Sequence, residues 1–140
     1  MHIQREPIDK HTIRAYSDSQ VKVGEEIYVQ SLIISKQQIL SPWSVTAVEQ
    51  LTESSAEPLL QSKPDVILLG HAGSLKMLPM AFISALSKQR IGLECMSVGA
   101  ACRTFNVLLS EGRKVVVGII FESNLSPGLQ NIRDLPEFSQ

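Results

Sequence analysis

The residues best suited to chemistry surround Ser97, at the junction of a predicted strand and a predicted helix. If Ser97 caps that helix, the amides of Gly99 and Ala100 lie in its first turn, where the helix dipole adds a partial positive charge. Arg103 and Asn106 follow three residues apart on the polar side of the helix. These residues could bind a carboxylate or phosphate. The alternative is a capped core helix whose polar face meets only solvent.

A second candidate feature is the glycine-containing segment Gly70-His71-Ala72-Gly73, which follows an apolar run and is predicted to turn. In open parallel sheets, ligands collect at the carboxyl ends of the strands, and this turn is expected at the same edge as Ser97. Gly70 and His71 therefore join the candidate ligand-binding residues, and a histidine there could serve as a general acid or base. The alternative is a histidine in a solvent-exposed loop. The glycines do not complete the GxGxxG motif of dinucleotide-binding proteins.

Other chemistry is not supported by the residue pattern. Cys95 and Cys102 lie seven positions apart without a CxxC pair, so we expect two reduced thiols, with Cys102 buried and unreactive. The histidines are scattered and form no HxxxH or HExxH pair, so we predict neither a metal site nor a cofactor. Common hydrolase and phosphotransferase motifs such as GxSxG and the P-loop are missing.

The first half of the chain is expected to form short strands. Alternating residues over 12–16 and 21–23 predict a hairpin, and the apolar pattern over 26–35 predicts one longer, central strand covered on both faces. Pro42 should break the chain or mark a strand edge, because it lacks an amide donor. Trp43, which follows it, is expected to anchor the core.

The second half alternates strand and helix, which predicts parallel strand pairs with right-handed crossovers. Ser54 to Glu57 fits a capping box, with Pro58 in the first turn of a short helix through Gln61. Apolar residues of the last predicted helix recur at three- and four-residue intervals and should be buried: Val98, Ala101, Cys102, Phe105, Leu108 and Leu109. The remaining predicted elements are a strand over 65–69, a helix over 79–88, a strand over 91–96, the helix over 98–111 and a strand over 114–121.

Length and composition limit the function. With 140 residues, the chain has room for one domain, which we place at 12–121 between a lead of 1–11 and a polar tail of 122–140. Its 13 basic and 14 acidic residues give no general attraction to nucleic acid. The longest apolar run, 115–121, is too short to cross a bilayer, so no membrane insertion is expected. The first ten residues lack the apolar core of a signal peptide, which favours a cytoplasmic protein.

The segment from Gly92 to Ser97, continued by Ala100 to Arg113, is similar to the signature of the Mth938-like family, known also as domain of unknown function 498. The strand led by Pro64 and the region of Trp43 extend the resemblance over about 12–121. The resemblance implies an α/β fold of three layers, with a mixed, largely parallel central sheet, helices and an additional β layer. Eukaryotic relatives include a mitochondrial assembly factor of respiratory complex I and a cytosolic protein linked to adipogenesis. Most bacterial members have no assigned activity.

Three positions depart from the family pattern: threonine is usual at Ser97, tyrosine at Phe105, and a GTG-like turn where Gly70-His71-Ala72 stands. Ala72 restricts the backbone where glycine would permit a positive φ, which disfavours close approach of a ligand. The residues before Thr12 do not have the composition of a mitochondrial transit peptide, so a bacterial protein is favoured.

Two functions follow from these observations. The first is a non-enzymatic binding or assembly module with a protein partner, because the sequence completes no set of nucleophile, base and orienting residue. The alternative is a small-molecule enzyme or a protein that binds a small anion at Ser97 with Arg103 and Asn106. The sequence leaves the oligomeric state open.

Overall fold

A five-stranded sheet forms the middle layer of the computed structural model, which describes residues 10–74 and 77–122. Strand β6 is parallel to both of its neighbours, β7 and β8, whereas β4 is antiparallel to β5 and β8. The predicted parallel pairs are therefore confirmed. The predicted lead of 1–11 and tail of 122–140 fall almost entirely outside the described residues. In spatial order the strands are β5 (Ile39–Leu40), β4 (Leu32–Ile34), β8 (Val115–Ile120), β6 (Val66–His71) and β7 (Gly92–Ser97).

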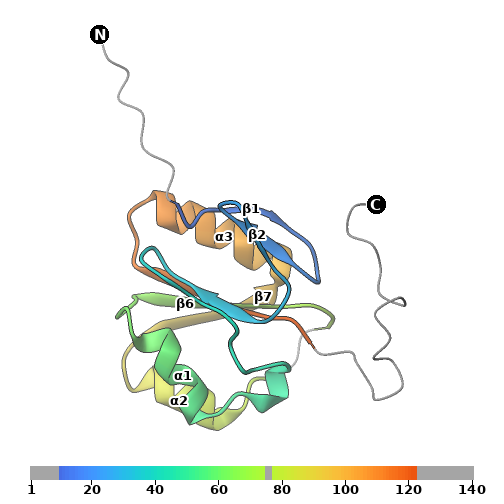
Figure 1. Cartoon of the computed structure of the whole chain (residues 1–140). Helices are drawn as coiled ribbons and strands as arrows, with labels where there is room; N and C mark the ends of the chain where they lie inside the picture. The colour runs from blue at the N-terminus through green and yellow to red at the C-terminus, as the bar shows by residue number, and fades with distance from the viewer. Residues whose placement is uncertain (1–9, 75–76, 123–140) are drawn as a thin grey trace, which may run out of the picture.

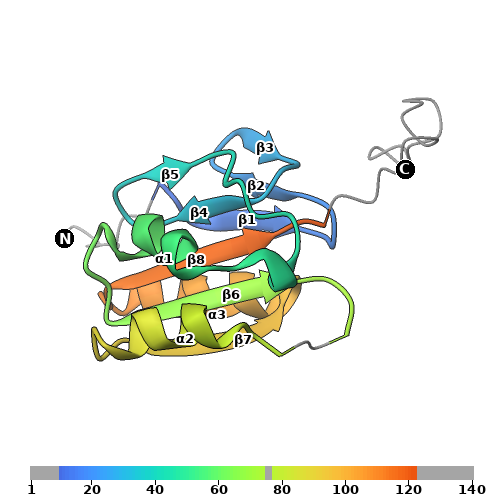
Figure 2. The ribbon, with the colours of Figure 1, turned by 90° about the horizontal axis from the view of Figure 1, so that it is seen from below.

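Helices cover both faces of this sheet. Helices α1 (Glu53–Leu60) and α2 (Met80–Ser87) contact each other on one face, and the 3-10 helix η1 (Val48–Gln50) precedes α1. Helix α3 (Val98–Ser110) packs on β6 and β8 from the opposite face (Figures 1 and 2). Ser97 caps α3, and Gly112 follows the helix with a φ of 78°, as the pattern of a helix closed by glycine predicts.

A small antiparallel sheet lies beside α3 on the same side of the central sheet (Figure 1). It consists of β1 (Ile13–Tyr16), β2 (Val21–Val23) and β3 (Glu26–Tyr28). The β1–β2 hairpin agrees with the alternation in the sequence. The sheet supplies the additional β layer, so the three-layer α/β fold implied by the family resemblance is confirmed.

The prediction of one central strand over 26–35 was wrong. The segment contributes β3 to the small sheet and β4 to the central sheet, and Ile27 and Val29 are 55% and 52% exposed. Between the two strands, the buried Ser31 accepts a hydrogen bond from the amide of Phe121 at 2.9 Å. A run of apolar residues on both faces has the same pattern whether it forms one strand or two. The point where the chain passes from the small sheet to the central sheet is therefore fixed by tertiary contacts such as this one.

Two local predictions in the second half also need correction. Helix α1 is capped by Thr52 and Ser55, each of whose side chains accepts a hydrogen bond from the backbone amide of the other. Because the helix begins before Ser54, Pro58 lies inside it and not in its first turn. The strand predicted over 65–69 extends through Gly70 and His71, which pair with Met96 and Ser97 of β7.

The core consists of two hydrophobic clusters, one on each face of the central sheet. The cluster toward α3 includes Phe105 and side chains of the small sheet, and the cluster toward α1 and α2 includes Trp43. Trp43 is 4% exposed, which confirms its predicted role as a core anchor. Its Cζ3 atom lies 2.8 Å from the position that a Cβ atom on Gly118 would occupy, so the indole packs directly on the backbone of β8.

Candidate functional site

The structure places the residues of the predicted anion site around the carboxyl edge of the sheet, but on different faces. His71 and Ser97 are neighbours in register on β6 and β7. Side chains alternate along β6: Leu69 belongs to the cluster toward α1 and α2, whereas a Cβ atom on Gly70 would meet α3. His71 therefore faces the α1 side, away from the N-terminus of α3.

Gly70 allows α3 to pack closely on β6. A Cβ atom at this position would lie 2.8 Å from the Cβ of Ala101 and 3.2 Å from the Cα of Val98. Gly70 therefore serves the packing of the protein's own helix, and its predicted role in ligand binding stays a prediction.

From the sequence, His71 was expected either to face an open crevice or to lie in an exposed loop. The structure shows neither arrangement. It is 2% exposed, and its Nδ1 atom donates to the carbonyl oxygen of Ala72 at 3.0 Å. Its Nε2 atom is buried and has no hydrogen-bond partner among the residues that the structure describes. The structure thus keeps this imidazole away from any substrate in solution.

Ser97 acts as a helix cap, as predicted. Its hydroxyl oxygen accepts a hydrogen bond from the amide of Ala100 at 3.2 Å, so that donor of the first turn is already satisfied. The ring of Tyr16 lies against Gly99, with Cε1 3.0 Å from the position of a Cβ atom there. The small sheet therefore covers part of the helix end that was predicted to accept an anion.

Arg103 is exposed and is held by the small sheet. Its Nη1 atom donates to the hydroxyl of Tyr16 at 2.8 Å, and its guanidinium carbon lies 5.9 Å from the centroid of the Tyr16 ring. The pairing with Tyr16 depends on the packing of β1 beside α3, for which the sequence carries no local signal.

We expect Arg103→Ala to lower the free energy of unfolding by less than about 1 kcal/mol, because exposed polar and cation–π contacts contribute little. Thermal unfolding with Arg14→Ala as the control measures this change. If Arg103 also binds a small anion, phosphate or citrate should raise the melting temperature of the wild type and leave that of Arg103→Ala unchanged. A loss of several kcal/mol would contradict the exposed position of Arg103.

Asn106 joins α3 to β1. Its Oδ1 atom accepts from the amide of Ile13, and its Nδ2 atom donates to the carbonyl of Ile13, both at 2.9 Å. The side chain satisfies both backbone groups of a strand residue in place of a neighbouring strand. Its observed role is to attach the small sheet, and its predicted role in anion binding stays a prediction.

The two cysteines are free thiols. Burial raises the pKa of the Cys102 thiol to about 12, although the neighbouring Arg103 opposes the shift. Burial also raises the pKa of Cys95. Since the thiolate is the nucleophile, neither cysteine is activated at neutral pH. Within residues 10–74 and 77–122, no three His, Cys, Asp or Glu side chains gather as metal ligands would.

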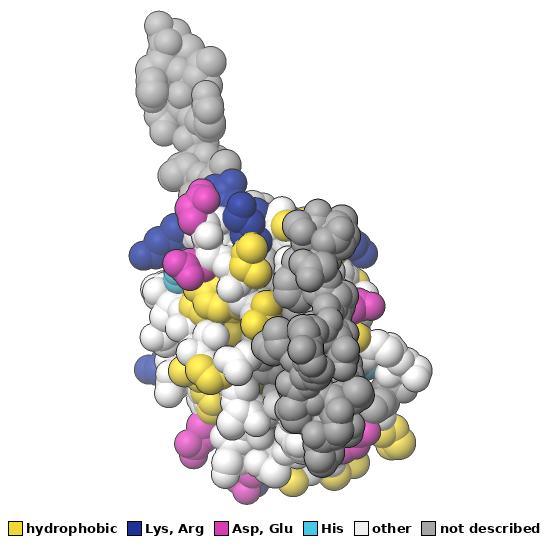
Figure 3. Space-filling view, turned by 45° about the vertical axis from the view of Figure 1, so that its right-hand side comes forward, with side chains coloured by type: hydrophobic (Ala, Val, Ile, Leu, Met, Phe, Trp, Pro, Cys, Tyr) yellow, Lys and Arg dark blue, Asp and Glu magenta, His cyan; other side chains and the backbone are white. Residues whose placement is uncertain are grey.

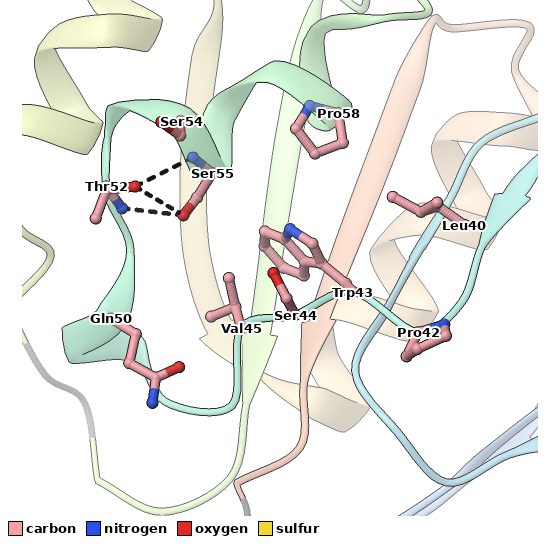
Figure 4. Close-up of a pocket in the computed structure, with 10 residues that line it drawn as sticks. All are labelled: Leu40, Pro42, Trp43, Ser44, Val45, Gln50, Thr52, Ser54, Ser55 and Pro58. Carbon is pink, nitrogen blue, oxygen red and sulfur yellow. Dashed lines mark hydrogen bonds between the residues drawn. The ribbon is translucent and has the colours of Figure 1, made fainter.

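A groove of about 410 Å³ opens between α1 and the loop that carries Trp43 (Figure 4). We call it the Trp43 groove. In Figure 4, Pro58 lies above the indole and Leu40 to its right, and the capping residues Thr52 and Ser55 form part of the rim. None of its ten lining residues is charged: Leu40, Pro42, Trp43, Ser44, Val45, Gln50, Thr52, Ser54, Ser55 and Pro58.

The sequence pattern does not predict this groove. It predicts Trp43 as a core residue and Pro58 as a residue at the start of a helix, and each prediction concerns a single element. The groove arises because α1 and the loop after β5 are brought together by the central sheet. The signal that could have pointed to the groove is that Pro42, Trp43 and Pro58 lie near serine and threonine residues in both of the segments that line it.

The comparisons with known proteins agree with this architecture. A family model described as a protein of unknown function (DUF498/DUF598) matches residues 13–120. A Xanthomonas campestris protein solved by NMR is 33% identical, with a TM-score of 0.74 over 90% of this chain and 96% of the other. A Bordetella pertussis protein described as a Mth938-like domain has a TM-score of 0.72 at 22% identity, over 91% of this chain and 97% of the other. The latter similarity concerns the fold alone.

Two curated relatives have different names. A "13 kDa major membrane protein" of Francisella tularensis is 28% identical over 101 residues, which are 71% of this chain and 80% of the relative. An NADH dehydrogenase [ubiquinone] 1 alpha subcomplex assembly factor 3 of Drosophila melanogaster is 27% identical over 119 residues. That match covers 81% of this chain but only 60% of the fly protein. In the described part of the chain, no helix has the length and apolarity needed to span a bilayer.

Proposed function

For this chain, which belongs to the DUF498/DUF598 family of proteins of unknown function, we propose a non-enzymatic role as a module that binds another protein. The observation that carries the proposal is the Trp43 groove, whose ten lining residues include no charged side chain. A concave surface that combines apolar side chains with hydrogen-bonding groups suits an aromatic or aliphatic side chain of a partner. The name of the fly relative, an assembly factor, supports a role in which binding itself is the function.

The chemistry of the described residues also favours binding over catalysis. Ser97 is engaged as a helix cap, His71 is buried, and the Cys102 thiol is not activated. The groove itself contains hydroxyl groups and the Gln50 amide but no general base. It therefore offers surface for recognition and no group suited to bond cleavage.

Exposed apolar side chains provide further support. Figure 3 shows hydrophobic side chains that gather on one face beside charged side chains of both signs. Leu40, which is 44% exposed, lines the Trp43 groove and offers apolar surface to a partner there. The exposed large hydrophobic residues are Tyr16, Ile27, Val29, Leu40, Met77, Met80 and Val107.

We also propose that the protein acts in the cytoplasm of a bacterium. Two free thiols are typical of a reducing compartment. The similar proteins from Xanthomonas and Bordetella are bacterial. Fractionation of the native host should recover the chain in the cytosolic fraction, whereas recovery in washed membranes would contradict this location.

The binding proposal is tested with a substitution that fills the groove. Ser54→Arg places a long side chain at an exposed lining position, while Ser87→Arg makes the same change at the end of α2, outside the groove. We expect Ser54→Arg to reduce capture of partners from host extract at least tenfold, whereas Ser87→Arg captures them like the wild type. Quantitative mass spectrometry of the captured proteins measures the difference.

Both substituted residues are exposed positions of their helices, so melting temperatures within a few degrees of the wild type are expected. The proposal fails if the wild type captures no specific protein, or if Ser54→Arg captures the same proteins in the same amounts.

A further inference from the structure

The Trp43 groove is one end of a longer depression. A second groove of about 70 Å³ shares Leu40 and Pro58 with it, and continues between β5 and the end of α1. A third groove of about 260 Å³ shares Ser35 and Ser62 with the second. The three therefore form one track, which follows the edge strand β5 from the Trp43 loop to the turn between α3 and β8.

The far end of this track is cationic. Lys36 comes from the turn between β4 and β5, while Arg113 and Lys114 come from the turn between α3 and β8. All three residues are exposed, and no acidic residue lines the third groove. Glu111 and Asp65 lie on the adjoining chain segments but are not among its lining residues. We call this end the cationic groove.

The two ends of the track thus differ in chemistry, and the small middle groove connects them. The Trp43 groove has no charged lining residue, and the cationic groove has three basic ones within a chain of net charge −1. The basic residues are therefore a local concentration of charge. A site of this kind selects ligands by charge complementarity and by the spacing between their apolar and charged residues.

We propose that the partner contributes an extended segment in which apolar residues are followed or preceded by acidic ones. The apolar part occupies the Trp43 groove, and the carboxylates lie against Lys36, Arg113 and Lys114. An extended segment suits the track because the track is elongated and runs beside β5, which ends the central sheet and pairs with β4 alone among the described strands. This inference rests on the proposed function and specifies the class of its partner.

The test is a selection from a random peptide library displayed on phage, with the full chain as the bait. The bait is compared with the variant Lys36→Ala/Arg113→Ala/Lys114→Ala. The matched control is Arg14→Ala/Lys88→Ala/Arg90→Ala, which also removes three positive charges from exposed residues, none of which lines the track. Melting temperatures of the three baits establish that each is folded before selection.

The wild type and the control should enrich peptides that combine apolar residues with Asp or Glu. A peptide synthesised from the enriched set should bind about tenfold more weakly to the Lys36/Arg113/Lys114 variant, and this difference should shrink as salt is raised. Enrichment of apolar peptides without an acidic preference, or equal binding to the wild type and this variant, overturns the inference and leaves the proposed function standing. If no peptide is enriched by the folded wild type, both fail.

Discussion

Phe105→Ala should lower the free energy of unfolding by about 3 to 5 kcal/mol, the range for removing a fully buried aromatic ring from a core. Phe105 has no exposed surface and belongs to the cluster that α3 shares with the central sheet and the small sheet. Removing the ring leaves a cavity in the cluster where α3, the central sheet and the small sheet pack together. Since a domain of this size has a net stability of roughly 5 to 15 kcal/mol, the loss should be evident in chemical denaturation.

Leu108→Ala is the matched comparison for this prediction. The helical pattern placed Leu108 on the same buried stripe, but the structure shows it partly exposed and packed at the margin of the cluster. We expect a smaller loss of about 1 to 2 kcal/mol, because less apolar surface is returned to water. Equal losses for the two variants would contradict the orientation of α3.

Gly70→Ala should lower the free energy of unfolding by about 1 to 3 kcal/mol, because the added methyl group overpacks the core. The added methyl group would lie 2.8 Å from the Cβ of Ala101 and 3.2 Å from the Cα of Val98. These atoms belong to the first turns of α3 and cannot rotate away, so β6 and the helix must separate.

Gly92→Ala is the control, since a methyl group on that β7 residue meets its nearest neighbour, Val66 Cγ2, at an ordinary 3.7 Å. Its stability should stay within about 0.5 kcal/mol of the wild type. Unfolding by urea distinguishes the two variants. A Gly70→Ala protein as stable as the wild type would show that this glycine is not required for packing and would return it to the candidate ligand site.

Local pattern was sufficient for most elements of the second half, although it misplaced the start of α1. Ser97 and Gly112 limit α3 by the chemistry of caps, and the apolar run ending at Ile120 has the composition of a parallel strand. These features depend on residues close together in the chain, so the sequence contains them.

The predicted site was less accessible to the same reasoning. Arg103 and Asn106 were correctly assigned to the polar side of the helix, but their partners Tyr16 and Ile13 come from a strand about 90 residues earlier. The layer that covers α3 is a consequence of tertiary packing and has no periodic signal in the helix. For the same reason, the Trp43 groove becomes visible only when α1 and the loop after β5 are placed on the sheet.

The central claim is that the Trp43 groove binds a protein partner, and site-specific photo-crosslinking tests it most directly. A photoreactive amino acid is introduced at Ser44, an exposed lining residue, and in a separate protein at Ser19, an exposed residue of the turn between β1 and β2 that lines none of the three grooves. Illumination in the native host should yield a discrete protein adduct from position 44 and none from position 19. Adducts of equal yield at both positions, or none at position 44, would contradict the account.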